Sequence, residues 1–424
     1  MQLSKQIFSQ HNIQLWKLSE DTNTYNRYRD MLNGSLVNGI YSNKLNNSLL
    51  MSKLPRFSDL DYVVFVHDGC DIRKPYSELQ EYLGWVRDLD GGWVRGYCTL
   101  NTIQVSMNSK TVDLLYCSPY SSEMPDYVSN AERKLYETGQ LKDKTRRQQI
   151  EQLLSENLDF NYKKLLFEQI KTVSQAVKAV NPAIMVIHVL DRYQDDKEVF
   201  SYIDNLGDYF VIRLKKNHKD KDGIGISKSD LEGEVRQKYE RLTHLDKEYH
   251  DLEAVYEWGA YQGYDMLRVS LYHSKSGNRV FKEPMMLCTN LVISGFLMAF
   301  LVFEFYLHRW KIESVFRFLK QVLGWEELRN AARLIQDWES IKNLLSLAFF
   351  VGGYFYEIED ELTKDPQIIW LAELGGGKGK ITRGYILRGI AKLLEMKQTQ
   401  DFLHKNNISE AKVEQVLKRF KGTY

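Results

Sequence analysis

A line of charged side chains runs along an otherwise apolar segment near residue 310. In the run YLHRWKIESVFRFLK, residues Tyr306, Arg309, Glu313 and Lys320 follow one another at spacings of three, four and seven. At about 100° per residue these positions fall in a stripe about 60° wide on one helix face, and Arg317 joins them. The fold must bury the apolar faces of this helix and give the central carboxylate a partner, because an unpaired buried charge costs free energy.

Two interpretations of the stripe are open from these residues alone. Glu313 lies four residues from both Arg309 and Arg317, which is the spacing of ordinary ion pairs on a solvated helix face. Metal ions and phosphates are equally natural partners for a line of charge on an apolar helix. The choice depends on what the rest of the chain supplies.

Two segments upstream predict buried strands that lead into aspartates. Residues 61–66 read DYVVFV and deliver Asp68, and residues 183–190 read AIMVIHVL and end directly at Asp191. An aspartate after a strand is commonly only a turn or helix N-cap residue. Each segment alone is therefore weak evidence for a functional site. The evidence is stronger for the two segments and the charged stripe together, because of their order and spacing.

Taken together, the three blocks resemble a known protein family. The Tyr-Arg-Glu-Lys stripe, with HDGCDIRKP around Asp68 and LDRYQDD around Asp191, is similar to the signature of the insertion sequence 4 family of bacterial DDE transposases. The resemblance covers about residues 61–329. It implies that Asp68, Asp191 and Glu313 are the catalytic carboxylates of an enzyme that hydrolyses and transesterifies phosphodiesters.

The implied chemistry explains why carboxylates are needed. Hard divalent cations take oxygen ligands and keep several waters, so a few carboxylates and phosphate oxygens are enough to hold them. The resemblance implies two Mg²⁺ ions, which Mn²⁺ can replace, with Asp68, Asp191 and Glu313 as ligands. Asp71 is the internal competitor, because it can be either the ligand or a structural neighbour of the basic residues that follow it.

A set of DNA contacts around the stripe is also implied. The residues expected to bind DNA are Tyr306, Arg309, Arg317, Lys320 and Arg329. Arginine offers a planar fork to phosphate oxygens, whereas lysine acts as a point charge. The implied partner is double-stranded DNA, both the element's terminal repeats and the target, held by a homodimer.

The family's activity is cut-and-paste DNA transposition. Water nicks each element end, the freed 3′-hydroxyl attacks the opposite strand to form a hairpin, and a second water reopens it before strand transfer. Two other function classes stay open. One is a catalytically inactive relative that binds element ends and inhibits transposition, and the other is an RNase H-like nuclease without strand transfer. The complete set of three carboxylates argues against the first.

Composition indicates a cytoplasmic protein without a membrane span. The four cysteines show no paired spacing and no nearby histidine cluster, so we expect reduced thiols that bind no zinc. No charged and then apolar leader opens the chain. Residues 287–303 lack charge, but polar residues interrupt them, and we expect a buried helix there. The net charge of +1 is low for a DNA-binding protein, although local basic patches, such as the residues after 374, can still bind DNA.

Hydrophobic patterning predicts an α/β fold with an RNase H-like mixed sheet flanked by helices. The expected strands are 61–66, 93–106, 111–119, 183–190 and 208–216, with helices over 160–180 and 196–206. We divide the chain into a helical N-terminal region (1–56), which is either a small DNA-binding region or a helical cap, the first part of the catalytic core (57–214), an inserted β-rich subdomain (215–286), the second part of the core with the Glu helix (287–345), and a helical C-terminal region for dimerisation or DNA contact (346–424).

One position departs from the family pattern. Members often place a tryptophan at the end of the insertion, where it stacks on an unpaired base, but this chain reads MMLCT at residues 285–289. Trp258, Tyr261 or Tyr264 can supply such a ring, or can simply pack in the core or across strands. The GGGKGK run near Gly375 lacks a preceding strand and a GK-Ser/Thr ending, so we expect a flexible linker there.

Overall fold

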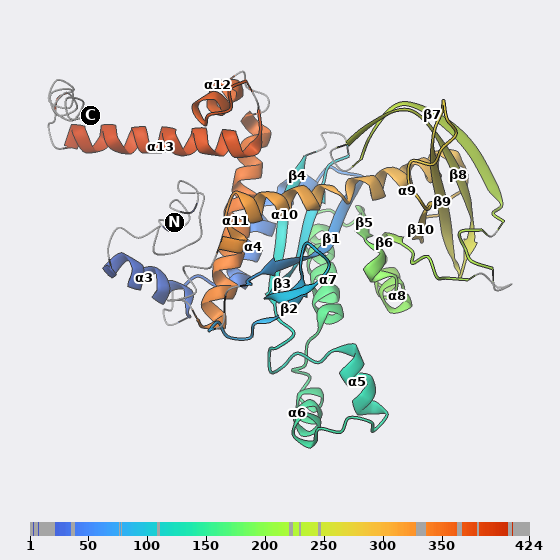
Figure 1. The fold of residues 1–424 in the computed structure, drawn as a ribbon, viewed down its shortest axis with the longest axis horizontal. Coiled ribbons are helices and arrows are strands. Elements are labelled where there is room, and N and C mark those ends of the chain that lie inside the picture. Colours follow the sequence, from blue (N-terminus) through green and yellow to red (C-terminus); the bar gives the residue numbers. More distant parts are fainter. Residues whose placement is uncertain are drawn as a thin grey trace.

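A single mixed sheet runs through the molecule, and helices pack on both of its faces (Figure 1). The computed structural model describes residues 3, 7, 22–34, 39–75, 77, 79–107, 111–219, 224–228, 230–244, 247–327, 336–362, 367–379, 381–405 and 409. The strands are β1 Tyr62–Arg73, β2 Gly84–Arg87, β3 Trp93–Val105, β4 Val112–Tyr120, β5 Met185–Leu190, β6 Tyr209–Arg213, β7 Gly233–His244, β8 Lys247–Tyr261, β9 Tyr264–His273 and β10 Met285–Thr289.

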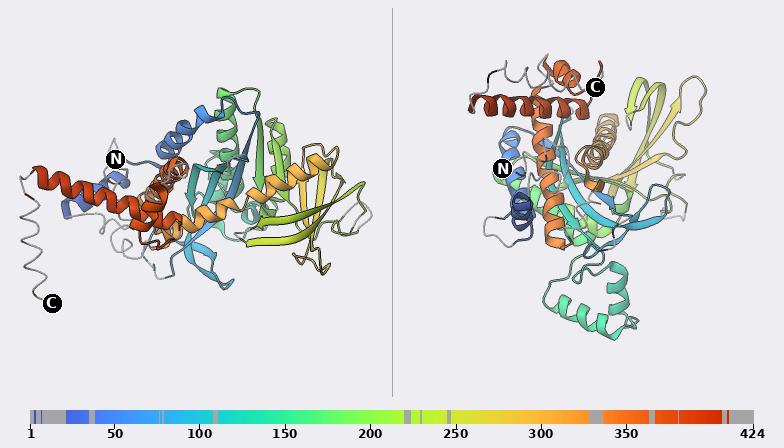
Figure 2. Two further views of the ribbon diagram at one scale, coloured as in Figure 1. Left: turned by 90° about the horizontal axis from the view of Figure 1, so that it is seen from above. Right: turned by 60° about the vertical axis from the view of Figure 1, so that its left-hand side comes forward.

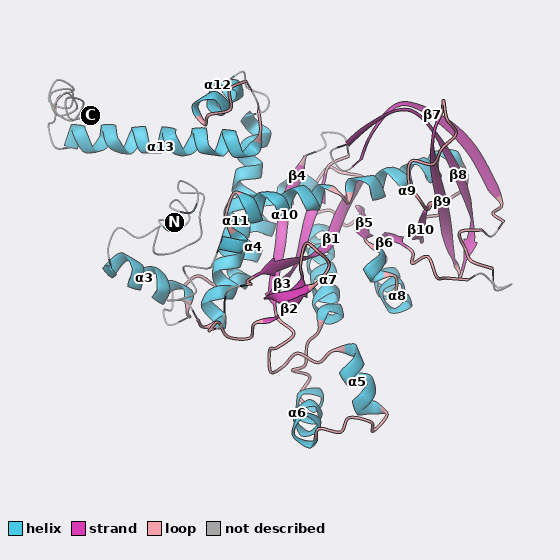
Figure 3. Ribbon diagram, viewed as in Figure 1, coloured by secondary structure: helices cyan, strands magenta, loops and turns pink. Residues whose placement is uncertain are grey.

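Helices flank and extend this sheet, as the colouring by secondary structure in Figure 3 shows. They are α3 Thr22–Leu32, α4 Ser42–Lys53, α5 Asn130–Glu137, α6 Lys144–Ser155, α7 Tyr162–Val180, α8 Lys197–Asn205, α9 Phe296–His308, α10 Lys311–Gln321, α11 Trp338–Leu362, α12 Gln367–Leu374 and α13 Arg383–Lys405. No helix among the described residues is long and apolar enough to cross a bilayer.

The strand order is that of an RNase H-like core, so the predicted fold class is confirmed. Strands run in the order β2-β3-β1-β5-β6-β10-β9-β8-β7, and β4 pairs with the far side of β3. Strands β1, β5 and β6 are parallel to one another, whereas β1 pairs with β3 and β6 pairs with β10 in the antiparallel direction. Parallel strands need crossover connections, which α7 and α8 supply.

Alternation along β1 divides the core into two layers. Val64 and Val66 pack into the larger apolar cluster with α9, α10 and α11, whereas Val63 and Phe65 face α7 and α4. This two-residue alternation is what a strand buried on both faces requires. The sheet therefore holds the site between a layer with α7 and α8 and a layer with the Glu helix.

Strands β7, β8 and β9 fill the segment for which a β-rich insertion is predicted. They join the same sheet through β10, which pairs with β6 on one side and β9 on the other. The boundary placed at residue 286 falls inside β10, and the proposed domain limits stay a prediction. Helices α5 and α6, for which the sequence patterns gave no prediction, project from the body (Figure 2).

The predicted helix over residues 287–303 is wrong in its first half. Met285–Thr289 form β10, a turn follows, and α9 begins only at Phe296. A short apolar run is compatible with a buried strand or a buried helix, and periodicity does not separate the two. Here pairing decides, because β10 occupies the place between β6 and β9.

The charged stripe also lies on two helices instead of one. Helix α9 ends at His308 and α10 begins at Lys311. Between them the N–H groups of Arg309, Ile312 and Glu313 each donate to the carbonyl three residues back, a tightened turn. The two helices still run end to end across the sheet (Figure 1).

Two basic residues of the N-terminal region are used to hold the fold together. Lys53, whose side chain is 0 % exposed, forms ion pairs at 3.1 Å with both Asp113 of β4 and Glu357 of α11. Arg56 pairs with the same two carboxylates at 2.9 and 2.8 Å. These two cations fasten α4 against β4 and α11, as a helical cap does.

The glycine-rich run near Gly375 forms the turn between two packed helices, so the prediction of a flexible linker is wrong. A Cβ atom at Gly375 would meet the carbonyl oxygen of Tyr385 at 1.8 Å, and one at Gly389 would meet that of Leu371 at 1.9 Å. Glycine therefore lets α12 and α13 approach closely.

A chain of buried polar side chains crosses the sheet beneath the site. His67 of β1 lies opposite Thr102 of β3, with 2.8 Å between His67 Nδ1 and Thr102 Oγ1. The Nε2 atom of His67 is 2.8 Å from Nδ1 of His188, whose own Nε2 is 3.1 Å from Oδ2 of Asp208. Thr102 Oγ1 in turn donates to Gln169 of α7 at 2.8 Å. The residue before Asp68 is thus held by hydrogen bonds on both ring nitrogens.

Candidate active site

The parallel pairing of β1 with β5 brings two predicted aspartates together. Val66 pairs with Val189, and Asp68 and Asp191 lie two residues further along their chains. Asp191 caps the short 3₁₀ helix Arg192–Gln194, with its Oδ1 accepting from the N–H of Tyr193 at 2.7 Å. Asp191 therefore follows its strand as expected. Asp68 does not, because β1 continues to Arg73.

Glu313 approaches the same edge from α10, which packs against β1. The guanidinium of Arg309 joins it to the first aspartate: Nη1 is 2.6 Å from Oδ2 of Asp68, and Nη2 is 3.1 Å from Oε1 of Glu313. Arg309 is 5 % exposed at its side chain, Asp68 19 % and Glu313 40 %. The arginine is thus buried between two carboxylates that open toward solvent.

The charge balance of this group is negative. The pKa of Asp68 is raised to about 7, chiefly by burial; Arg309 opposes this rise, and the neighbouring charges of Asp191 and Glu313 add to it. The pKa of Glu313 is also raised, chiefly by burial. Arg309 and Arg317 oppose this rise, and the charge of Asp191 adds to it. One guanidinium therefore does not neutralise the three carboxylates.

This balance bears on whether a divalent cation fits. Carboxylate oxygens are the ligands that hard cations prefer, and the three carboxylates outnumber the one guanidinium that bridges two of them. Among the described residues, however, no group of three or more His, Cys, Asp or Glu side chains is close enough to hold an ion. The donor set fits a divalent cation in type and charge, and Arg309 bridges two of its members in this structure.

Tyr306 and Arg309 are both buried in this arrangement. The Arg309 guanidinium lies 4.0 Å from the centre of the Trp310 ring and 5.9 Å from that of Tyr306. Burial raises the pKa of Tyr306, and its hydroxyl is hydrogen-bonded to Arg213 of β6. Neither side chain is presented to solvent for the phosphate contacts that the family resemblance implies.

An open cavity of about 320 Å³ lies beside Asp68 and Glu313. Lys320 lines it and lies 3.4 Å from Glu326. Arg317 is exposed one turn away on α10. Arg329 lies outside the residues that the structure describes.

Asp71, the competitor of Asp68, also lines this cavity. Its Oδ2 accepts from the N–H of Arg87 at 3.1 Å, and its Oδ1 lies 3.5 Å from the thiol of Cys98. These two partners of Asp71 lie on β2 and β3. The basic Arg73 and Lys74 bind elsewhere, to Glu326 and to the carbonyl of Trp325.

None of the three aromatic residues considered for base stacking is freely presented. Tyr261 is 5 % exposed and its hydroxyl is 2.7 Å from Nδ1 of His218. Tyr264 packs edge-on against the rings of Phe200 and Phe210. Trp258 is half-buried. The core-packing alternative describes all three.

Two groups of residues at this edge escaped the sequence analysis. Arg192 and Arg213 immediately follow or end β5 and β6, the strands next to β1. Trp85 and Trp93 are exposed on the β2–β3 hairpin, each with an arginine over its ring. The two arginines lie at or near the ends of predicted strands, and this position could have pointed to them. No pattern pointed to the tryptophans, because β2 was not predicted.

Comparison with known proteins supports the same chemistry for part of the chain. Residues 169–336 match the family model described as a transposase DDE domain. The match includes Asp191, Glu313 and the Tyr306, Arg309 and Lys320 stripe, and it begins after Asp68. No curated protein sequence matches the chain. The geometry and the family match together support a DDE transposase domain that acts on DNA.

Proposed function

We propose that this protein is a DNA transposase of the insertion sequence 4 type, which cuts its element free and inserts it by strand transfer in the cytoplasm. The observation that carries the proposal is the meeting of Asp68, Asp191 and Glu313 at one edge of an RNase H-like sheet. The reaction is in-line displacement at phosphorus, in which an oxygen nucleophile forms the new bond as the O3′ bond breaks.

Asp68, Asp191 and Glu313 are the residues that would hold Mg²⁺ or Mn²⁺. When bound, a pair of such ions stabilises the charge on the attacking and leaving oxygens. The three side chains contribute negative oxygen ligands on a rigid sheet edge and on α10. Arg309 orients two of them through its two hydrogen bonds, and its short link to Asp68 keeps that carboxylate facing the cavity.

Lys320 and Arg317 would meet the DNA backbone at the mouth of the cavity. Both lie on α10 with Glu313, and Lys320 lines the cavity that Asp68 opens into. Their charges favour phosphates without reading sequence. Tyr306 and Arg309, and Arg329, complete the proposed set, with the first two reaching DNA only after they move from their buried positions.

The test is cleavage of the element's terminal repeats in Mg²⁺ by three variants, Asp68→Asn, Asp191→Asn and Glu313→Gln. Each should lose end cleavage by a factor of about 10³ or more while still binding DNA, because one lost ligand removes transition-state stabilisation but few phosphate contacts. Asp71→Asn is the matched control and should cleave normally.

The outcomes also separate the alternatives. Near-normal cleavage by any one variant removes that residue from the site, and selective loss in Asp71→Asn exchanges the roles of Asp68 and Asp71. Wild-type protein that binds ends but never cuts would be an inactive inhibitor. Cutting without joining to target DNA would identify a nuclease.

We also propose that two copies act together and that the C-terminal helices contribute to pairing. Helix α13 extends away from the body (Figure 2) and carries exposed Leu393, Leu394 and Met396. Deleting residues 375–424 should reduce complexes that hold two DNA ends more than cleavage chemistry on pre-nicked single ends. Unchanged paired complexes in a gel shift would refute this role.

A further inference from the structure

A basic trough begins beside the carboxylates and leads toward the β7–β9 part of the sheet. It is a cavity of about 290 Å³. Its basic lining residues are Arg192, Arg213, Lys216, Lys228 and Arg279, and its one acidic lining residue is Glu283. Arg192 directly follows Asp191, so the near end of the trough adjoins the candidate site.

Most of these cations have no carboxylate partner among the described residues, although Arg279 lies over the Tyr272 ring at 5.8 Å. Arg192, Lys228 and Arg279 form no ion pair with any carboxylate that the structure describes. Lys216 lies 3.3 Å from Glu283, but both side chains are well exposed and such a pair contributes little. Gathering like charges around one hollow costs free energy unless an anion occupies it.

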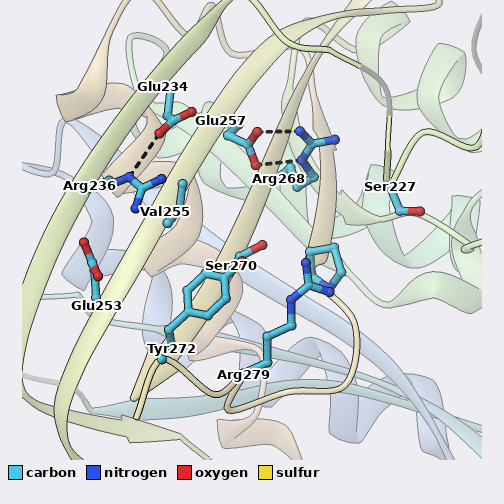
Figure 4. Close-up of a pocket in the computed structure, with 12 residues that line it drawn as sticks. Ser227, Glu234, Arg236, Glu253, Val255, Glu257, Arg268, Ser270, Tyr272 and Arg279 are labelled. Atoms are coloured by element: carbon cyan, nitrogen blue, oxygen red, sulfur yellow. Dashed lines mark hydrogen bonds and ion pairs between the residues drawn. The ribbon is translucent and has the colours of Figure 1, made fainter. Parts of the chain in front are cut away.

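The next cavity along the sheet is different, although it shares Ser227, Arg279 and Pro284 with the trough. Its volume is about 540 Å³, and its other arginines are already paired (Figure 4). Arg268 forms a two-pronged pair with Glu257, and Arg236 lies 3.1 Å from Glu234. The excess positive charge is thus confined to the end nearest Asp191.

We propose that the basic trough binds the backbone phosphates of the DNA strand that flanks the cleaved bond. This inference rests on the proposed function. A strand whose scissile phosphate lies at Asp68, Asp191 and Glu313 continues away from them, and Arg192 and Arg213 stand at the same edge on the neighbouring strands. Arginine forks and lysine point charges bind phosphate oxygens without reading bases.

The first measurement is DNA affinity as a function of salt, by fluorescence anisotropy in EDTA. Arg279→Gln with Lys228→Gln removes two cations and keeps the side-chain stems. Each lost phosphate contact lowers the slope of log K against log salt by about 0.9 for duplex DNA, so the double variant should lose about 1.8 and bind roughly 10- to 100-fold more weakly at low salt.

The matched controls are Arg241→Gln and Lys275→Gln. Both cations lie on the same part of the sheet, but each is paired with a carboxylate, Glu248 at 2.8 Å and Asp251 at 3.2 Å. Their salt slopes should stay at the wild-type value. Every substituted side chain is exposed, so we expect all variants to melt at the wild-type temperature. Measuring the melting temperatures tests whether loss of fold causes any change in binding.

The second measurement locates the strand. Neutral methylphosphonates are placed one at a time in the strand beside the cleavage point of the terminal repeat. Wild-type protein should bind more weakly when a phosphate that the trough contacts is made neutral. The Arg279→Gln variant should show no such loss of affinity at one of these positions, because Arg279 and that phosphate are coupled partners.

Equal salt slopes for the double variant and wild type, or full methylphosphonate sensitivity in Arg279→Gln at every position, would overturn the trough while leaving the transposase proposal intact. Trough-dependent binding without cleavage by wild type would overturn the transposase proposal and keep the phosphate site. Wild-type protein that binds no DNA would overturn both.

Discussion

Two groups of cations along the sheet differ in how their charge is held. Arg309, Lys53 and Lys74 are buried, and each is held by carboxylates or by a backbone carbonyl. In the basic trough, Lys228 and Arg279 are exposed and have no carboxylate partner among the described residues. Burial without a partner is costly, so the fold depends on the contacts of the first group. Exposure without a partner leaves the second group available to a ligand.

Replacing Lys53 should give the largest stability effect. Lys53→Met leaves Asp113 and Glu357 with Arg56 as their remaining cation. We expect the free energy of unfolding to fall by about 3 kcal/mol, since breaking a buried pair strands a charge. Urea denaturation measures this. Lys275→Met, which removes an exposed cation, should change stability by less than about 0.5 kcal/mol, and equal losses would erase the contrast.

Replacing Arg309 should affect both stability and chemistry. Arg309→Gln removes the cation between Asp68 and Glu313, and we expect a loss of about 2 kcal/mol in stability and roughly 100-fold in end cleavage, for all end sequences alike. Arg309→Lys should recover only part of this, because lysine cannot bridge two carboxylates in the same way. Melting and cleavage are measured on one preparation. A stable variant with normal cleavage would remove Arg309 from the site.

Stability should depend on pH through Asp68. Its pKa is raised to about 7 by burial, whereas in the unfolded chain it is near 4. Between these values the folded protein holds a proton that the unfolded chain releases, so Asp68 costs stability as pH rises from 4 to 7. In EDTA, Asp68→Asn should match wild type near pH 4 and exceed it by about 2 kcal/mol at pH 8. A difference that does not change with pH would contradict the negative charge balance.

The smallest change in stability is expected from the hydrogen bond that links β8, through His218, to the loop after β5. Tyr261 of β8 is hydrogen-bonded to His218, whose Nε2 lies 2.6 Å from Oδ2 of Asp195 in the loop after β5. Tyr261→Phe should cost about 1 kcal/mol, the usual value for one such bond, and should leave the salt slope of DNA binding unchanged. Thermal unfolding checks the first part. A changed salt slope would show that this link also positions the trough.

The sequence patterns predicted the strands and helices whose period is long and regular. Strands β1, β3, β4, β5 and β6 and helices α7 and α8 follow from alternation and helical spacing. The short β2 has only four residues, too few to show a period, although its partner β3 is the next strand along the chain. The other two failures share a cause: β10 and the break at Arg309 involve partners that are distant in sequence. Local patterns carry no record of such partners.

The same limit applies to the site. Motif spacing singled out Asp68, Asp191 and Glu313, which stay a prediction as catalytic residues, and the pairing of Arg309 with Glu313 follows from their four-residue separation. It did not predict that Arg309 also reaches Asp68, because 241 residues separate them. The basic trough was missed for the same reason, since its cations come from segments between residues 192 and 279 that only the sheet brings together.

In the chain of polar side chains beneath the carboxylates, one hydrogen bond determines which atom donates in the next. Gln169 must turn its amide NH₂ toward the carbonyl of Leu100, which only accepts, so its oxygen receives the one hydroxyl hydrogen of Thr102. Nδ1 of His67 must then donate to Thr102. Its Nε2 is left as an acceptor, in keeping with a neutral ring whose pKa burial lowers.

Nδ1 of His188 therefore donates to Nε2 of His67, and the other ring nitrogen of His188 lies 3.1 Å from Oδ2 of Asp208. Every link from His188 to Gln169 donates in the same direction, and reversing one would require reversing them all. The residue before Asp68 is therefore anchored by a chain of hydrogen bonds with one fixed direction.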